Sequence, residues 1–209
     1  MGASQTTSPS SATPASLVRR RSYHVGNVRS QLSAAASALL ETEGAAALSL
    51  RAIARRTGVA VGTVYYHYAD KQALLGGLAV DGFRDLAHAM RGAVEARTAS
   101  GLRASGIAYL DFVRARPALY GLMYEVRETG RRDEVIEAEA AAFAEMHRAI
   151  ALDFEPEARP EVVRPVTQAI WACARGIAAL ALARGGPAGM ADDTVAEAVR
   201  GLEILVARR

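Results

Sequence analysis

The sequence contains a single cysteine, Cys173, among its 209 residues. One thiol can neither form a disulfide within the chain nor build a cysteine-cluster metal site. No run of 18 or more apolar residues is free of charged residues, so we expect no membrane-spanning helix. The first residues also lack the apolar core of a secretory signal. These absences predict a cytoplasmic protein with no metal or other cofactor and no membrane partner.

Residue patterns typical of catalytic centres are missing as well. The sequence has no phosphate-binding loop, no His-x-x-x-His spacing for a metal, no Ser-His-Asp order and no paired carboxylates on one predicted helix face. Its four histidines are scattered, at His24, His67, His88 and His147. A small helical enzyme is therefore the least favoured function, and we expect the protein not to be an enzyme.

Strand signals are weak, because the short Val-, Ile- and Tyr-rich runs lie inside helical patterns. Apolar residues make up 51% of the chain and recur mostly at three- and four-residue spacing, which predicts an all-α protein of about nine helices. Asn27 is a suitable N-cap for the first helix and Gly44 a suitable stop. We expect helices at about 27–43, 50–57, 62–68, 71–96, 102–116, 117–127, 132–153, 161–184 and 191–207.

Prolines and glycines mark several boundaries of these helices. Pro117 and Pro160 lie at predicted helix starts, where a missing N–H costs little. Pro165 either marks the true start of the helix predicted over 161–184 or kinks it. The glycine-rich segment 185–189 separates the last two helices and favours an antiparallel hairpin.

Positive charge is concentrated at the start of the chain. Residues 1–71 carry a net charge of +5, whereas the remainder carries −2. This asymmetry suggests a nucleic-acid partner at one end of the molecule, although a solvated basic face would also explain it. Residues 1–22 are rich in Ser, Thr, Ala and Pro and are predicted to form a disordered tail. Within it, Arg19–Arg21 could contact a DNA backbone, but a solvated tail is favoured.

Residues 49–68 predict two short helices that cross at a steep angle. Ser49 caps the first of them, the small side chain of Ala54 allows close packing, and Gly58 can adopt the positive φ that the turn needs. The shared core is expected to contain Ile53, Val59, Val64 and Tyr68. The second helix would then enter the major groove of DNA. The side chains expected on its outer face are Val61, Gly62, Thr63, Tyr65, Tyr66 and His67.

The stretch 23–78 resembles the DNA-binding domain of the TetR (tetracycline-repressor) family of transcription regulators, from Tyr23-His24-Val25-Gly26-Asn27 through Thr63-Val64-Tyr65-Tyr66-His67-Tyr68 to Leu74-Leu75. The resemblance implies that one set of residues faces base edges, namely Arg51, Val61, Gly62 and Tyr65. It implies that another set holds phosphates, namely Ser49, Thr63, Tyr65, His67 and Lys71. The sequence departs from the usual pattern at Ala60 and Val61, where a serine and a polar residue are frequent. Since Val61 cannot hydrogen-bond a base, direct readout is expected to depend on Arg51.

Residues 100–126 more loosely resemble the fifth and sixth helices of one TetR subgroup, whose eighth helix carries a Trp followed by a His-Gly pair. The corresponding run here is Trp171-Ala172-Cys173-Ala174-Arg175-Gly176, so an arginine replaces the histidine. The family resemblance implies an effector cavity, although each residue taken singly is more often core than pocket. The predicted cavity residues are Phe83, Leu86, Met90, Tyr109, Phe112, Val113, Tyr120, Met123, Tyr124, Phe143, Met146, His147, Trp171 and Arg175. Aromatic and methionine side chains beside His147 and Arg175 suit a largely apolar effector with one polar or anionic group.

The last two helices carry apolar residues that could pair with those of a second copy. They are Ile170, Cys173, Ile177 and Leu180, followed by Val195, Val199, Leu202 and Val206. A four-helix bundle formed in this way would give a homodimer with a twofold axis. Two recognition helices about 34 Å apart would then read a near-palindromic operator.

The sequence as a whole predicts a helix-turn-helix domain at 23–70 and a helical effector-binding and dimerisation domain at 71–209. The favoured function is a repressor that a small-molecule effector releases from double-stranded DNA. A ligand-independent regulator or an activator of the same fold is the alternative. The helix at 71–96 joins the two domains and is expected to couple them.

Overall fold

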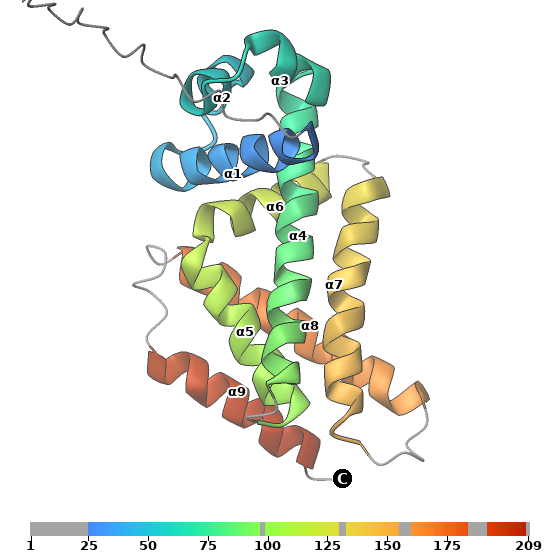
Figure 1. The fold of residues 1–209 in the computed structure, drawn as a ribbon. Helices are drawn as coiled ribbons and strands as arrows, with labels where there is room; N and C mark the ends of the chain where they lie inside the picture. Colours follow the sequence, from blue (N-terminus) through green and yellow to red (C-terminus); the bar gives the residue numbers. More distant parts are fainter. Residues whose placement is uncertain (1–24, 97–98, 130–132, 155–159, 184–191, 208–209) are drawn as a thin grey trace, which may run out of the picture.

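The computed structural model describes residues 25–96, 99–129, 133–154, 160–183 and 192–207, and within these ranges every regular element is an α-helix (Figure 1). The predicted tail at 1–22 and the glycine-rich break at 185–189 lie outside the described residues. The helices are α1 (Val25–Glu43), α2 (Leu50–Thr57), α3 (Val61–His67), α4 (Lys71–Glu95), α5 (Gly101–Ala115), α6 (Pro117–Thr129), α7 (Asp133–Ala151), α8 (Pro160–Ala183) and α9 (Asp192–Ala207). The predicted all-α fold of about nine helices is confirmed.

Helices α1, α2 and α3 form a small unit at one end of the molecule (Figure 1). Its centre contains side chains with no exposed surface, among them Leu32, Ile53 and Val64. Gly44 ends α1 with a φ of 79°, as its position predicted. Asn27 does not cap α1, because the helix begins two residues earlier at Val25 and Asn27 lies inside it. The N-cap prediction at Asn27 was therefore wrong.

Helix α4 connects this unit to the rest of the chain. Its 25 residues extend about 38 Å, and Figure 1 shows α4 running from α2 and α3 down between α5 and α7. It packs against α5, α6 and α7. Gly82 lets α6 approach closely, because a Cβ there would lie 2.6 Å from the sulfur of Met123. Helix α4 is thus a rigid element shared by both halves of the molecule.

The start of α5 is held by the end of α7. The Asp153 carboxylate accepts hydrogen bonds from the backbone N–H groups of Gly101 and Leu102, both at 2.7 Å. The α5 backbone lies so close to α7 that a Cβ at Gly101 would lie 1.8 Å from the carbonyl oxygen of Ala149. This junction orients α5, which carries Tyr109 and Phe112.

Two of the predicted proline boundaries are confirmed, since α6 begins at Pro117 and α8 begins at Pro160. Pro165 lies inside α8, so it does not mark the start of that helix. None of the helices in the described ranges is both long and apolar enough to span a bilayer.

Candidate nucleic-acid interface

The start of α2 is built as its sequence predicts. Ser49 has an extended backbone, and its Oγ accepts a hydrogen bond of 3.1 Å from the N–H of Ala52. This bond satisfies one of the backbone donors that every helix start leaves open. Leu50, Ile53 and Ala54 are buried, while Ser49 and Arg51 are exposed. Helix α2 therefore packs its apolar side inward and presents Arg51 to solvent.

The turn between α2 and α3 requires glycine. Gly58 has a φ of 69°, in the left-handed region that residues with a Cβ seldom adopt. Val59 follows it into the core with 7% of its surface exposed. Ala60 precedes α3 without a side-chain cap. The predicted helix-turn-helix is therefore present, and the orientation of α3 depends on Gly58.

Gly58→Ala is expected to lower the free energy of unfolding by about 1–2 kcal/mol, the usual cost of a left-handed conformation for a residue with a Cβ. Gly62→Ala is the matched control, since Gly62 is helical and a Cβ there has nothing within 4 Å. The control should gain up to about 1 kcal/mol from helix propensity. Urea denaturation followed by circular dichroism measures both, and equal stability of the two variants would contradict the assigned turn.

The outer face of α3 is apolar and aromatic. Val61 is 41% exposed, Tyr65 50% and Tyr66 85%, and Gly62 is exposed beside them. Thr63 and His67 are half-buried, and the rings of Tyr66 and His67 meet edge to face at 5.3 Å. Tyr68, predicted to be core, is 2% exposed. Neighbouring exposed apolar and aromatic side chains are rare on a protein surface that contacts only water. This group on α3 therefore indicates a contact with a partner.

Exposed basic side chains lie on α2 and at the start of α4, the helices that precede and follow α3. Arg51 is exposed on α2, and sequence reasoning had not singled out Arg55 and Arg56 at the end of the same helix, which are also exposed. Lys71 is exposed at the first position of α4, and its Nζ donates to the carbonyl oxygen of Ala45 at 2.9 Å. An ammonium group has three donors, so this bond leaves Lys71 able to meet a phosphate as well.

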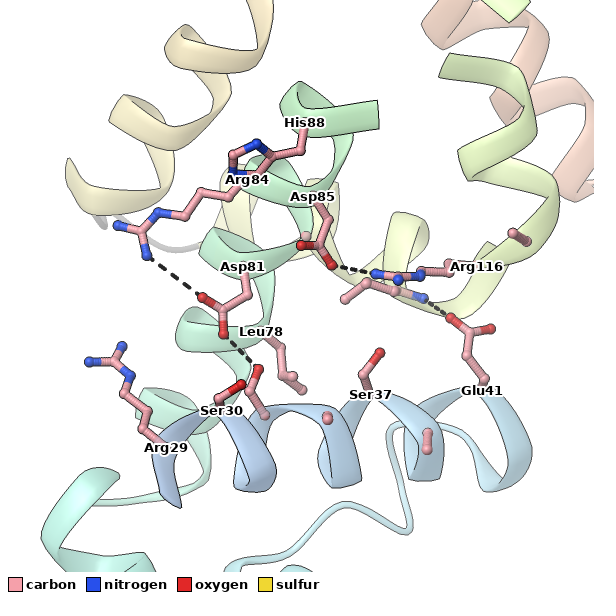
Figure 2. Close-up of a pocket in the computed structure, with 16 residues that line it drawn as sticks. Arg29, Ser30, Ser37, Glu41, Leu78, Asp81, Arg84, Asp85, His88 and Arg116 are labelled. Atoms are coloured by element: carbon pink, nitrogen blue, oxygen red, sulfur yellow. Dashed lines mark hydrogen bonds and ion pairs between the residues drawn. The ribbon is translucent and has the colours of Figure 1, made fainter. Parts of the chain in front are cut away.

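A cleft lined by both polar and apolar side chains lies between α1 and the helices α4, α5 and α6, and sequence reasoning had not predicted it. It encloses about 880 Å³ between α1, α4 and the corner of α5 and α6. Figure 2 shows Ser30, Ser37 and Glu41 of α1 facing Asp81, Asp85 and His88 of α4 across it. The serines and Glu41 recur at three- and four-residue spacing, which is the signal that could have revealed a polar helix face.

Many of the residues predicted to bind an effector gather in one aromatic cluster. The Tyr109 hydroxyl lies 2.7 Å from that of Tyr120 and 3.4 Å from that of Tyr124. Burial raises the pKa of all three tyrosines above the ordinary value of a phenol, so they are neutral groups that can donate and accept. Ring contacts connect Phe83 to Tyr124 and Trp171 to both Tyr109 and Phe143.

Two cationic or titratable side chains border the cluster. The Arg175 guanidinium lies 4.0 Å from the centre of the Tyr124 ring and 3.2 Å from the carboxylate of Glu128. His147 stacks on Phe143, and its Nδ1 lies 3.0 Å from Thr167 Oγ1. Leu86, Met90 and Met123 are fully or almost fully buried nearby in the same core. The structure thus brings these residues together as packed core, whereas Phe112 lines a hollow of about 500 Å³ beside α4 and α5.

The residues predicted for a dimer interface have mixed surroundings. Cys173 is exposed on α8, and Ile177 and Leu202 are half-buried. Ile170 is only 3% exposed, so it belongs to the core of its own chain and has little surface for a second copy. The side chains of Val195 and Val199 lie outside the described part of α9. Leu180, also predicted for this interface, is 64% exposed on α8, and Leu205, which was not predicted, is 70% exposed on α9.

Comparisons with known proteins agree with this architecture. A family model of bacterial regulatory proteins, tetR family, matches residues 32–78, and one of a tetracyclin repressor-like C-terminal domain matches residues 102–204. No curated protein matches the chain.

Several solved structures share the fold. A protein with unknown function from Rhodococcus sp. RHA1 is 31% identical, with a TM-score of 0.68, and the alignment covers 87% of this chain and 96% of that one. A bacterial regulatory protein in the tetR family from Rhodococcus RHA1 is 22% identical, with a TM-score of 0.57 and coverage of 84% and 93%. The fatty acid degradation regulator FadR from Bacillus halodurans is 16% identical, with a TM-score of 0.64 and coverage of 83% and 93%. The last two show a shared fold alone.

Proposed function

The chain belongs to the TetR family of DNA-binding transcription regulators, and from this premise we propose that it is a homodimeric repressor that a small-molecule effector releases from its operator. The observation that carries the DNA-binding part is the exposed face of α3, with Tyr66 85% exposed and further basic side chains exposed on α2 and at the start of α4. In a bacterium such a regulator acts in the cytoplasm, which is part of the proposal. We also propose a division into a DNA-binding domain at 23–70 and an effector-binding and dimerisation domain at 71–209.

We propose distinct roles for the residues around α3. Arg51, Val61, Gly62 and Tyr65 face base edges, with Arg51 as the main hydrogen-bonding group. Ser49, Thr63, Tyr65, His67 and Lys71 hold phosphates, and Tyr66 packs against the DNA backbone. The exposure of Arg51 and Tyr65 and the position of Lys71 at the first residue of α4 support these roles.

Arg51→Ala and Lys71→Ala are expected to weaken DNA binding in different ways. Loss of Arg51 should cost about 1–3 kcal/mol and relax the preference at one base position, whereas loss of Lys71 should weaken all sequences alike and reduce the salt slope by about 1. Fluorescence anisotropy measures both, with duplexes that the wild-type protein selects from a random pool.

Two further variants make this comparison specific. Lys71→Arg keeps a positive charge at the start of α4, and Arg164→Ala removes an exposed arginine from α8. Arg164→Ala should bind DNA as the wild type does. Lys71→Arg should bind DNA almost as well, with a small loss because a guanidinium fits this position less well than an ammonium group. If neither Arg51→Ala nor Lys71→Ala changes binding, the proposed placement on DNA is wrong.

The effector site is proposed at the aromatic cluster of Tyr109, Tyr120 and Tyr124. Its buried hydroxyls could accept or donate hydrogen bonds to a polar group, and Arg175 could pair with an anionic one. We also propose that Arg175 fills the position of the histidine in the Trp…His-Gly subgroup. Since these side chains are closely packed, an effector that enters must displace them and so shift α5 and α6. Calorimetry with decanoate as a probe would show binding that Tyr124→Ala and Arg175→Ala weaken.

The packing of this cluster also favours the second candidate, a ligand-independent regulator of the same fold. In that case no apolar acid binds, and DNA affinity stays the same when such acids are added. If the first candidate is right, effector must weaken DNA binding by the same factor by which DNA weakens effector binding.

The dimer is proposed to form through α8 and α9. Ile204 and Leu205, both exposed on α9, extend the predicted set of Cys173, Ile177, Leu180, Val195, Val199 and Leu202. Exposed apolar residues of this kind lower the solubility of a monomer. They become buried when the helix pairs of two copies form a four-helix bundle.

A further inference from the structure

Along α1, the contact between the DNA-binding unit and the rest of the chain includes discrete hydrogen bonds across the cleft. On the side facing the cleft, α1 carries Ser30, Ser33, Ser37 and Glu41, and polar groups bridge the gap (Figure 2). Discrete hydrogen bonds, unlike a continuous apolar interface, can be removed singly. The hydrogen bonds across the cleft therefore identify the side chains that attach α1 to the other helices, and each can be tested by a single substitution.

The strongest bridge is the Glu41 carboxylate. One of its oxygens accepts from the N–H of Ala118 at 3.1 Å and the other from the N–H of Leu119 at 2.8 Å. These are backbone donors in the first turn of α6, and Pro117 at the first position has no N–H to offer. A carboxylate at a helix start also meets the positive end of the helix dipole. Glu41 thus caps a helix that begins 76 residues after it in the chain.

The middle of α1 is attached to a different helix. Ser33 Oγ donates to the Asp81 carboxylate on α4 at 2.6 Å, and Arg84 lies 3.7 Å from the other oxygen of Asp81. Helix α1 is therefore attached to α4 through Ser33 and to α6 through Glu41. Because α6 and α4 hold different points of α1, a shift of α6 relative to α4 must tilt α1. Since α1 packs on α2 and α2 on α3, the tilt reaches the DNA-facing helix.

Helix α6 also carries the groups that an effector would displace. Tyr120 and Tyr124 of the aromatic cluster lie one and five residues after Leu119 on this helix. A rigid helix transmits a displacement at these residues to its first turn.

We propose that Glu41 is a positioning residue that couples α6 to the DNA-binding unit, as a second route beside α4. The inference rests on the proposed function for the signal that moves α6 and for the placement of DNA at α3. The coupling itself follows from the two bonds to Ala118 and Leu119 and requires that DNA bound at α3 be sensed at the start of α6.

Hydrogen exchange of the full-length protein tests this coupling. The amides of Ala118 and Leu119 are followed with and without a duplex that the wild-type protein selects from a random pool. In the wild type, DNA should slow exchange at both amides. In Glu41→Ala, exchange without DNA should be about tenfold faster at these two amides, the change expected from one lost hydrogen bond. The change on adding DNA should disappear even though DNA still binds.

Glu43→Ala is the matched control, because Glu43 is an exposed carboxylate on the same helix and should leave both amides unchanged. Glu41→Gln, which keeps the size of the side chain, serves if the alanine variant does not fold, and it should lose most of the DNA-linked change. An unchanged DNA response in these variants, or no response at these amides in the wild type, would overturn the proposal. If the wild type selects no DNA, the proposed function is wrong. If exchange at the amides of Ala118 and Leu119 without DNA is the same in Glu41→Ala as in the wild type, the coupling itself is refuted.

Discussion

Gly101→Ala is expected to lower the free energy of unfolding by about 3 kcal/mol or more, the upper end of the usual cost of overpacking. The added Cβ would lie 1.8 Å from the Ala149 carbonyl oxygen and 2.6 Å from its carbonyl carbon. Backbone atoms cannot rotate away as a side chain can. The Asp153 carboxylate also holds the N–H of Gly101 at 2.7 Å, so a shift of α5 would break this bond. Urea denaturation followed by circular dichroism measures the loss.

Gly121→Ala is the control for that substitution, because Gly121 is exposed within α6 and a Cβ there has nothing within 4 Å. Its stability should be equal to that of the wild type or higher by up to about 1 kcal/mol. If Gly101→Ala matches this control, α5 and α7 do not approach as closely as described.

The second large effect is expected on DNA binding. Replacing Tyr65 and Tyr66 together with alanine should weaken affinity for a selected duplex about 100-fold, since a hydrogen bond to a charged group such as phosphate contributes about 1.5–3 kcal/mol. The melting temperature should hardly change, because Tyr66 is 85% exposed and Tyr65 50%. Fluorescence anisotropy and thermal denaturation on the same preparation separate binding from folding.

Two controls accompany the tyrosine variant. Ile107→Ala removes an exposed apolar side chain from α5, away from α3, and should bind DNA as the wild type does. Tyr66→Phe keeps the ring and removes the hydroxyl, so it distinguishes packing on the backbone from a hydrogen bond to phosphate. If the double alanine variant retains full affinity, the outer face of α3 does not contact DNA.

Features with local causes could be predicted from the sequence. Ser49 and Gly58 act within three residues of themselves, Ser49 by capping a helix and Gly58 by allowing a positive φ. Spacing of apolar residues likewise gave the buried sides of α2 and α4. The one local error, at Asn27, arose because a good capping residue also fits inside a helix when the chain before it can continue the turn.

Features that join distant segments could not be predicted in this way. Glu41 and Asp153 cap helices that begin 76 residues later and 52 residues earlier in the chain, and a polar residue on a helix face looks like a solvent contact in sequence. Ile170 was assigned to an outer face because its spacing matches Cys173 and Ile177, yet the rotation of α8 against its own core buries it. Such contacts depend on how the helices pack, which local patterns do not determine.

Selection of duplexes from a random pool by the purified protein tests most directly whether this chain reads a DNA sequence through α3. We expect enrichment of a near-palindromic site whose half-sites lie about 34 Å apart, bound by a dimer with an affinity that falls steeply with salt. The Arg51→Ala variant should enrich a site with one position relaxed in each half. A pool that remains random after repeated selection would show that the chain does not read DNA sequence.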